Sequence, residues 1–463
     1  MASKRVRKAV LVLLVVVPIL VLAGSWAGFR WEKMATRDWA YRWGSVGNLL
    51  ALVGLPLLVT MVVLGARLPW VERVFGLDRM LRAHQLLAKV VVCLFLGHAL
   101  LRTVRVTMDM GMGWQWWFLL SLDPSNRGLL VGRLALYALL ILSPLALVGM
   151  RLLSFRAWKL PHLLLYPVVA AGFAHAMAIG DDFEKVPFNV LWYLLVAVFA
   201  GVTIYRIVAC ALRKRRGLWM VESVKRETDD TTTLQLSRAE GSGPFERRRA
   251  GQFAVLRIVY KHRLGEPRPF TISCTPDDEQ LWFTIKRAGA VSTALSGLRP
   301  RTRVLCEGPY GVFCPSGEEE RNLVLIAGGV GVTPFLSSVR HILRAVPDAR
   351  ITLLWNNKTR ADIFADEELR GLTEHKWLRV VHVLSREEAK EEAAERPPSG
   401  ETFPGVFTEH GHVTAQILER HVNPEGACFY LCGPPKMQRF VLGELRTAFG
   451  VRASQVQREL FFW

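Results

Sequence analysis

The chain has 463 residues, of which 51% are hydrophobic and only 21% are charged. This composition excludes a disordered chain, a small disulfide-stabilised scaffold and a uniformly soluble enzyme. The 59 lysine and arginine residues exceed the 40 acidic residues, which gives a net charge of +19. Because the basic clusters lie at the ends of apolar runs, the charge predicts a lipid bilayer as partner and no nucleic acid.

Six apolar stretches follow one another in the first half of the chain, at about residues 9–29, 45–66, 84–104, 128–150, 160–180 and 188–210. Each has about 21–23 residues, enough for a helix that spans roughly 30 Å of hydrocarbon. Basic clusters precede the first stretch and follow the second, fourth and sixth, whereas the alternate loops carry fewer basic residues. The positive-inside rule therefore predicts an integral protein of the inner or plasma membrane, with both termini cytoplasmic.

The first apolar stretch permits a second interpretation. Its basic start and its end at Ala23–Ala27 are also typical of a secretory signal. The topology of the other five stretches is the same either way. The seven cysteines form no Cys-x-x-Cys pair, which fits a reduced, cytosolic setting for the second half of the chain.

Four of the 11 histidines lie in the third and fifth stretches, at two matching depths. His84 and His98 are 14 residues apart, and His162 and His175 are 13 residues apart. At a rise of about 1.5 Å per residue, the two levels lie about 20 Å apart. Neutral imidazole is an axial ligand of haem iron, so the pattern predicts two stacked b-type haems. His84 and His162 would hold the inner haem, and His98 and His175 the outer haem.

A single histidine near a helix end is more often an interfacial residue, but four histidines in two depth-matched pairs favour ligation. Fourteen residues return a helix to within about 40° of the same face, whereas thirteen miss by about 140° in an ideal helix. Pro167 lies between His162 and His175 and can kink or twist their helix.

After Arg216 the pattern changes to short strands, turns and a few helices. The segments Leu218–Leu236, Gln252–Val259 and Leu281–Ile285 are predicted strands of a small antiparallel barrel. Within it stands Arg268-Pro269-Phe270-Thr271. The arginine can pair with a pyrophosphate, the aromatic ring can lie against a flavin, and the hydroxyl can reach a ring nitrogen.

Two further motifs complete a candidate FAD site. They are a candidate phosphate-binding helix start, Gly289-Ala-Val291-Ser292-Thr293, and the sequence Gly308-Pro-Tyr310-Gly. Each motif is weak by itself, since Pro-Phe-Thr can simply end a strand. Their order and spacing together carry the prediction.

From about residue 321, strands and helices alternate, which predicts a Rossmann-like parallel sheet. A Gly-rich turn, Gly328-Gly329-Val-Gly331-Val-Thr333-Pro334, follows a buried strand and opens a helix, as pyrophosphate-binding turns do. The next strand, 351–355, is followed by Asn356, Lys358 and Arg360. The two cations could hold a ribose 2′-phosphate or be solvated loop charges.

A later strand ends at Cys432-Gly433-Pro434, and the sequence ends in Phe461-Phe462-Trp463. Aromatic residues at a terminus are usually buried or functional. The terminal rings could stack on the flavin or merely pack against the domain.

These motifs give the chain a clear family resemblance. Residues 213–463 resemble the ferredoxin–NADP reductase superfamily. With the six spans ahead of them, the whole chain resembles the NADPH oxidase and ferric reductase superfamily in its minimal bacterial form. The resemblance implies a multi-domain α plus α/β fold: a six-helix di-haem domain at 1–212, an FAD-binding β-barrel at 213–318 and an NAD(P)H-binding domain at 319–463.

The resemblance also implies a reaction. NADPH or NADH gives a hydride to FAD, and single electrons then pass through the inner and outer haems to an acceptor at the external face. Thr271, Cys432, Phe461 and Trp463 would lie at the reacting rings. Membrane oxidases often have histidine where this chain has Arg268, and arginine matches the soluble reductases. Neither a calcium-binding region nor a Pro-rich tail is recognisable, so we expect constitutive activity without an obligatory regulatory subunit.

The terminal acceptor is less constrained than the donor. Oxygen, giving superoxide, would need a small external pocket with a cation such as Arg42 or Arg133. A ferric chelate would need a wider vestibule, and a periplasmic redox protein would need a docking surface. The sequence favours oxygen, with the other two as alternatives.

Overall fold

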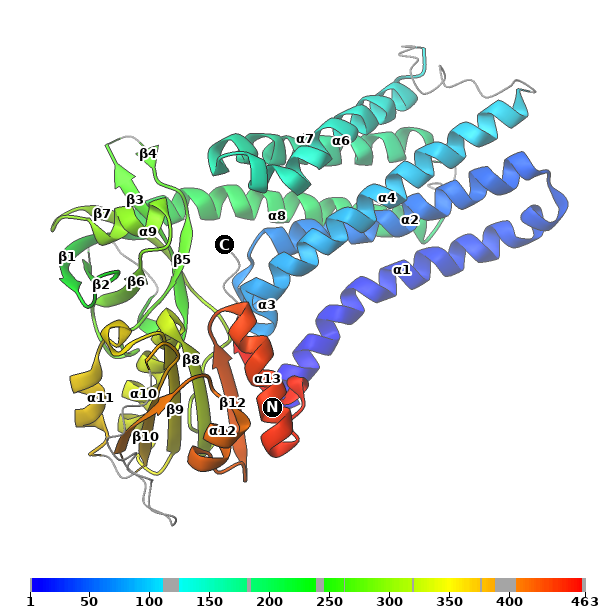
Figure 1. Ribbon diagram of the computed structural model, residues 1–463. Coiled ribbons are helices and arrows are strands. Elements are labelled where there is room, and N and C mark those ends of the chain that lie inside the picture. Colours follow the sequence, from blue (N-terminus) through cyan, green and yellow to red (C-terminus); the bar gives the residue numbers. More distant parts are fainter. Residues whose placement is uncertain are drawn as a thin grey trace. The chain divides into compact units, whose positions relative to one another are not determined.

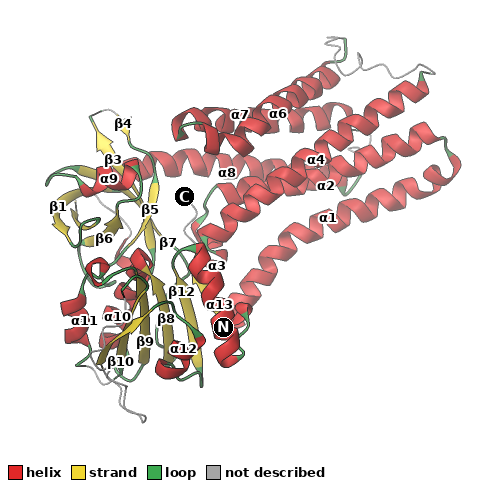
Figure 2. Ribbon diagram, in the orientation of Figure 1, coloured by secondary structure: helices red, strands yellow, loops and turns green. Residues whose placement is uncertain are grey.

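The computed structural model describes residues 2–110, 125–180, 185–238, 245–261, 263–318, 320–374, 377–387 and 405–459. The chain divides into two compact units, Met1–Cys210 and Ala211–Trp463. The first unit is helical, and the second contains two β-sheets with helices around them (Figures 1 and 2).

Each predicted apolar stretch lies in a helix of its own, so the six-helix prediction is confirmed. The six candidate spans lie in α1 (Ala2–Thr36), α2 (Trp39–Gly65), α4 (Leu77–Asp109), α6 (Arg127–Leu152), α7 (Phe155–Ile179) and α8 (Phe188–Arg216). A short helix, α3 (Pro69–Phe75), connects α2 to α4. The helices extend beyond the apolar runs because polar and basic residues continue them past the hydrocarbon.

Side-chain caps define where three of these helices begin. Asp38 accepts a hydrogen bond from Tyr41 N at 2.9 Å, and Asn126 accepts one from Leu129 N at 3.0 Å. Ser154 caps α7 in the same way, through Ala157 N. Each cap satisfies a backbone N–H that the first turn of a helix leaves unpaired. The short connections make α2 pack along α4, and α6 along α7 (Figure 1).

The first helix packs on the rest of the bundle. Trp26 Nε1 donates to Ser45 O on α2 at 3.1 Å, and Arg30 donates to Ser45 Oγ at 3.4 Å. Trp26 also belongs to a buried apolar cluster with Leu22 and Phe188. These contacts favour the membrane-helix interpretation of the first stretch over the secretory signal.

The second unit begins with an antiparallel sheet, as the sequence predicts. Its strands are β1 (Leu218–Arg226), β2 (Thr231–Arg238), β3 (Phe253–Tyr260), β4 (Arg263–Leu264), β5 (Arg268–Thr271), β6 (Leu281–Lys286) and β7 (Arg303–Tyr310). Their order is β4-β3-β7-β1-β2-β6, and β5 pairs with β3. Ser273 N, just after β5, donates to Trp282 O on β6 at 2.8 Å, which brings the two ends of the sheet together. The enclosed core includes Leu234, Leu256 and Phe283.

A six-stranded parallel sheet follows. It consists of β8 (Asn322–Gly328), β9 (Arg350–Asn357), β10 (Leu378–Leu384), β11 (Gly405–His410), β12 (Ala427–Cys432) and β13 (Val456–Glu459). The order is β11-β10-β9-β8-β12-β13, and all adjacent pairs are parallel. The chain first winds from β8 towards β11 and then returns to the other side of β8. The switch point therefore lies between β8 and β12, where open parallel sheets bind their ligands.

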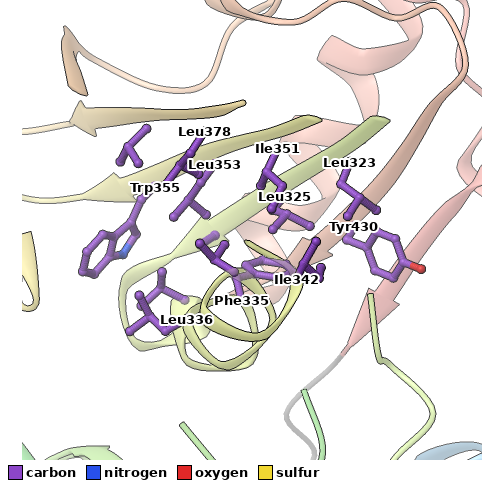
Figure 3. Packing of buried hydrophobic residues seen from close by; sticks show 14 of the residues in the cluster. Leu323, Leu325, Phe335, Leu336, Ile342, Ile351, Leu353, Trp355, Leu378 and Tyr430 are labelled. Carbon is purple, nitrogen blue, oxygen red and sulfur yellow. The ribbon is translucent and has the colours of Figure 1, made fainter. Parts of the chain in front are cut away.

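Both faces of the parallel sheet are covered. Leu323 and Leu325 point to one face, towards α10 (Thr333–Ala345) and α11 (Asp366–Leu372), whereas Val324 and Ile326 point to the other, towards α12 (Ala415–His421) and α13 (Pro435–Phe449). Figure 3 shows Phe335, Leu336 and Ile342 of α10 packed beneath the strands with Trp355. This alternation of buried residues explains the continuous apolar strands that the sequence shows.

Candidate functional site

The four histidines of the membrane unit meet in the two pairs that the sequence predicts. The rings of His84 and His162 have centroids 6.0 Å apart, and those of His98 and His175 have centroids 6.5 Å apart. His84 and His98 lie on α4, and the other two lie on α7, which contains Pro161 and Pro167. The pairs form although 13 residues separate His162 from His175, a spacing that an ideal straight helix would not place on one face.

Backbone carbonyls of neighbouring helices fix three of the four rings. His84 Nδ1 lies 2.8 Å from Met61 O, and His98 Nδ1 lies 2.9 Å from Gly47 O, both on α2. His175 Nδ1 lies 2.9 Å from Gly128 O on α6. An Nδ1–H bound to a carbonyl leaves Nε2 as the free lone pair, which is the tautomer that a metal ligand needs.

Glycines make room for two of these rings. A Cβ atom on Gly132 would lie 2.2 Å from His175 Nδ1, and one on Gly65 would lie 3.1 Å from His84 Cε1. Each glycine stands four residues after the carbonyl that holds the ring, so ring and helix backbone approach closely. Sequence reasoning missed these positions, because a glycine in an apolar helix carries no signal of its partner.

Two arginines accompany the histidine pairs. Arg206 on α8 donates to Gly65 O, and its charge acts on both His84 and His162. Arg102 on α4 donates to Asn48 Oδ1 at 3.5 Å, and its charge acts on both His98 and His175. Sequence reasoning missed both as site residues. Arg206 was detectable, since a cation within an apolar run is usually functional.

The geometry of the pairs fits haem better than a bare metal ion. With metal–imidazole bonds of about 2 Å, two ring centroids on opposite sides of one metal lie about 6 Å apart. Within the described ranges, no group of three or more histidine, cysteine or acidic residues could hold a metal. Two imidazoles per level suit a group that supplies its own equatorial ligands.

In the antiparallel sheet, two predicted FAD motifs meet through β3. Phe253 pairs with Thr271 on one side and with Tyr310 on the other, and the rings of Phe253 and Tyr310 have centroids 6.0 Å apart. Phe270 pairs with Ala254 in the adjacent row, and Thr271 is buried. Arg-Pro-Phe-Thr and Gly-Pro-Tyr are thus neighbours on one surface, although about 40 residues separate them in the sequence.

Arg268 and Gly308 occupy the edges of this surface. The Arg268 guanidinium is 37% exposed, and its nearest anion is the Glu266 carboxylate, at 3.6 Å. It is therefore accessible to a phosphate. Gly308 has φ +152°, and a Cβ there would lie 3.2 Å from Phe253 O, so this close approach of β7 to β3 requires glycine. Pro269 lies opposite Val255 in the β5–β3 pair.

The third FAD motif lies at the start of α9 (Ala290–Ser296), which packs on β2 and β6. Ser292 Oγ accepts from Ala288 N at 2.9 Å and from Gly289 N at 3.0 Å, and it donates to Gly289 O. Its hydroxyl is thus committed to capping its own helix. Val291 packs against the sheet core, whereas Thr293 is exposed. Phosphate binding here stays a prediction.

The nucleotide motifs come together at the switch point of the parallel sheet. A Cβ on Gly331 would lie 2.6 Å from Cys432 O, and one on Gly433 would lie 3.0 Å from Gly328 N. Gly329 has φ +54°, a conformation that favours glycine. These glycines bring the loops after β8 and β12 into backbone contact, and Thr333 and Pro334 begin α10 directly behind them.

Cys432 ends β12 with no exposed surface, and burial raises the pKa of its thiol well above the usual value. It is therefore a neutral thiol at physiological pH. Gln438 Nε2 donates to Gly433 O at 2.9 Å and to Glu459 O at 2.7 Å, which ties β13 to the same loop; Pro434 is exposed. Phe461 and Trp463 lie outside the described residues, so their predicted role is untested.

The candidate 2′-phosphate residues follow β9. Lys358 and Arg360 are exposed, whereas Asn356 donates to Val383 O at 2.9 Å. Arg360 N donates to the Glu387 carboxylate at 2.5 Å, and its guanidinium donates to Thr408 Oγ1 at 3.3 Å. Cationic side chains and a carboxylate therefore share this corner of the sheet.

The two sheets of the second unit are joined next to both candidate sites. Ser337, in the first turns of α10, donates to Cys274 O at 2.6 Å, and Arg340 donates to Ser273 O. Arg340 also binds the Glu368 carboxylate through two nitrogens, at 2.5 and 2.6 Å. The segment after Thr271 and the helix after the glycine turn are thus fixed against each other. Sequence reasoning missed Ser337 and Arg340, which stand in an ordinary helix pattern.

Comparison with known families assigns both units. Residues 49–173 match the family described as "Ferric reductase like transmembrane component", and residues 325–442 match "Oxidoreductase NAD-binding domain". The first match contains His84, His98 and His162 and ends two residues before His175, and the second contains the switch-point loops.

Similar curated proteins cover about half of the chain. A flavohemoprotein of Xylella fastidiosa is 29% identical over 236 residues, which are 50% of this chain and 55% of that protein. NADH-cytochrome b5 reductase 1 of Dictyostelium discoideum is 30% identical over 205 residues, 42% of this chain and 66% of that protein. The chain thus matches only about half to two thirds of the length of these relatives.

Two similar solved structures each cover about half of this chain. The FAD/NAD-binding domain of a nitric oxide dioxygenase from Vibrio cholerae is 22% identical, with a TM-score of 0.45, and covers 53% of this chain and 99% of that one. A ferredoxin NADP+ reductase from Neisseria gonorrhoeae is 19% identical, with a TM-score of 0.42, and covers 53% and 98%.

The two family matches agree with the order of the folds along the chain. The chain is therefore an oxidoreductase of the ferric reductase and NADPH oxidase type, in which a ferric reductase-like transmembrane component precedes an oxidoreductase NAD-binding domain.

Proposed function

We propose that this protein carries electrons from cytosolic NAD(P)H, through FAD and two haems, to an acceptor on the outer face of the membrane. The observation that carries the proposal is that four histidines on two membrane helices face one another in two pairs. The ring centroids are 6.0 Å apart in one pair and 6.5 Å apart in the other. The tautomers of three of these histidines, set by carbonyls, and the cations beside each pair support the same function.

In this proposal each histidine pair binds one haem b. Arg268 and the row formed by Thr271, Phe253 and Tyr310 (the flavin row) bind FAD. When bound, these groups would supply the change from two-electron hydride chemistry to single-electron transfer. The residues of the chain hold and orient them. The Ser337 and Arg340 contacts keep the flavin row and the switch-point loops together, so that a nicotinamide and a flavin ring can meet. The buried Cys432 thiol would be a neutral neighbour of the nicotinamide.

Topology gives the direction of transfer. The basic residues before the first span and after the second, fourth and sixth support a cytoplasmic position for both ends of the chain. The nicotinamide pool is then on the side of the second unit. His84 and His162 form the inner pair in this arrangement, and His98 and His175 form the outer pair.

We infer that oxygen is the acceptor and superoxide the product: one NAD(P)H and two O2 give NAD(P)+, two superoxide ions and one proton. A product anion needs a nearby cation. Of the two arginines that the sequence suggested, Arg42 donates to Arg37 O and Ala35 O between α1 and α2, whereas Arg133 is buried on α6 next to Gly132. Arg133 and Arg102 fit this role better than Arg42.

A ferric chelate is the second candidate, because the family that residues 49–173 match is a ferric reductase component. Purified protein in detergent separates the candidates. NADPH and NADH consumption is measured in air, with superoxide dismutase-inhibitable cytochrome c reduction as readout, and under argon with ferric citrate. We expect oxidation in air with an inhibitable signal. Oxidation under argon that depends on ferric citrate, without superoxide in air, would favour the ferric reductase.

The haem assignment is tested on the same preparation. A pyridine haemochrome assay should give close to two haems per chain, and His98→Ala should retain only the inner one. A wild-type protein without haem, or a His98→Ala variant with both haems, would overturn the proposed electron path.

A further inference from the structure

The four histidines are not equivalent. Three have Nδ1 within 2.8–2.9 Å of a backbone carbonyl on a neighbouring helix. The fourth, His162, has a buried Nδ1 without a hydrogen-bond partner in the described part of the chain. Such a carbonyl normally fixes a ligand ring and raises its basicity, so something else must hold His162.

A tryptophan lies against this ring. Trp158 stands one turn before His162 on α7, and the two rings have centroids 4.7 Å apart with an angle of 26° between their planes. Trp158 is itself anchored to the neighbouring helix, because its Nε1 donates to Ala146 O on α6 at 3.0 Å. Its indole is therefore held in place independently of His162.

The anchor of Trp158 resembles the anchor of His175 on the same helix. At the outer level, Gly128 O on α6 meets the His175 ring, and Gly132 makes room for it. At the inner level, Ala146 O meets the Trp158 ring, and a Cβ on Gly149 would lie 3.0 Å from Trp158 Cδ1. At the inner level, Trp158 therefore contacts a carbonyl and a nearby glycine of α6 in the same way as His175 does at the outer level.

We propose that Trp158 is the positioning residue for His162 and makes the inner ligand pair electronically different from the outer pair. The inference rests on the proposed haem ligation. Stacking sets the plane of the His162 ring, while the missing Nδ1–H···O bond leaves it a weaker electron donor than the other three. With haem bound, a weaker donor would stabilise the ferric state less, so the inner site would accept an electron more readily than it would if His162 also had a carbonyl partner.

The test uses the full-length protein in detergent, with Trp158→Leu and Trp158→Phe as variants and Trp70→Leu as control. Trp70 is an exposed tryptophan on α3 in the same unit. The readouts are haem content, the low-spin EPR signals of the two sites and their reduction midpoints. The His98→Ala background, which keeps only the inner site, assigns each signal.

We expect Trp158→Leu to move the EPR signal and midpoint of the inner site, with partial loss of its low-spin fraction, and to leave the outer site unchanged. Trp158→Phe keeps a ring but loses the bond to Ala146 O, so the same signals should move in the same direction by less. Trp70→Leu should match the wild type. If Trp158→Leu cannot be purified, the Phe variant decides alone.

Two haems with unchanged inner-site signals in the Trp158 variants would show that Trp158 only packs, and would overturn this inference. Equal shifts at both sites would overturn it as well, since a stacked ring acts locally. A wild-type protein without haem would instead refute the proposed function, so the two failures are distinguishable.

Discussion

The two units of this protein build their candidate sites from different materials. In the membrane unit, four imidazole side chains from two helices form the site, and the backbone of neighbouring helices orients three of them. In the second unit, the backbone itself forms the candidate nucleotide site, at the ends of β8 and β12, and the glycines there let two loops touch. The first kind of site is sensitive to the shape around each ring, and the second to any side chain placed between the loops.

This difference follows from the surroundings. Within hydrocarbon every backbone group must be satisfied inside the helices, so only side chains are free to bind a cofactor. At the edge of a parallel sheet, backbone N–H groups remain unpaired and can bind a phosphate. Glycine serves both units, but it makes room for a ring in one and for a backbone in the other.

The strongest test of this comparison is Gly132→Ala. The added Cβ would lie 2.2 Å from His175 Nδ1, and the ring cannot move away without losing its bond to Gly128 O. We expect loss of the outer haem, from two haems per chain to one, by pyridine haemochrome. Gly201→Ala on α8 is the matched control, since no atom lies within 4 Å of its Cβ. Equal haem content in both variants would mean that the ring needs no such space.

The corresponding test in the second unit is Gly331→Ala. Its Cβ would lie 2.6 Å from Cys432 O and 2.9 Å from Cys432 C, which are backbone atoms that cannot rotate away. We expect KM for NAD(P)H to rise by about tenfold or more, because displacement of a positioned loop by about 1 Å commonly costs this much. Haem content should stay at the wild-type value. The control is Gly443→Ala in α13, where no atom lies within 4 Å.

Sequence reasoning selected the candidate residues for binding and chemistry and missed those that position them. The histidine pairs, the Gly-rich turn and Arg-Pro-Phe-Thr each have a recognisable spacing or composition. The carbonyls of Met61, Gly47 and Gly128 have none, because every residue has a carbonyl and only tertiary packing selects one. Thr271 and Tyr310 come together because their strands both pair with β3, a third segment of the sequence, in a particular register.

A buried histidine of the second unit sharpens the contrast with the membrane histidines. His382 on β10 is 1% exposed, and its Nε2 lies 3.1 Å from the Asp366 carboxylate. Burial lowers the pKa of His382 from 6.5 to about 4, although Asp366 acts in the opposite direction. His382 therefore has a structural role. Its ring is neutral and contacts a carboxylate, whereas each membrane histidine faces a second imidazole.

The pH dependence follows from the sign of this shift. The folded protein binds fewer protons at His382 than the unfolded chain, so stability is complete above pH 6.5 and is lost as the pH falls towards 4. The loss amounts to about 3 kcal/mol. Hydrogen exchange of peptides from α11 and β10 should show this loss in the wild type. His382→Gln, which cannot titrate, should show less of it, and an identical pH dependence in both would refute the assignment.

The smallest expected effect concerns the choice between NADPH and NADH, for which side chains of the second unit are the candidates. Arg360 and Lys358 are exposed at the end of β9, but Glu387 accepts from Arg360 N at 2.5 Å, so a 2′-phosphate there would meet an anion as well as cations. An exposed cation–phosphate contact is worth about 1 kcal/mol or less. We therefore expect Arg360→Ala to raise KM for NADPH severalfold at most and to leave KM for NADH unchanged.

Two further variants decide how this corner discriminates. Glu387→Gln removes the anion and should lower KM for NADPH, again without changing NADH, because a ribose hydroxyl carries no charge to repel. Arg370→Ala is the control for loss of an exposed arginine, since Arg370 binds Asp366 on α11. Parallel changes for both nucleotides in the Arg360 and Glu387 variants would show that these residues shape the adenosine site in general. Changes confined to NADPH would place the 2′-phosphate beside Arg360. They would also show that side chains at this corner of the nucleotide site determine the choice between NADPH and NADH.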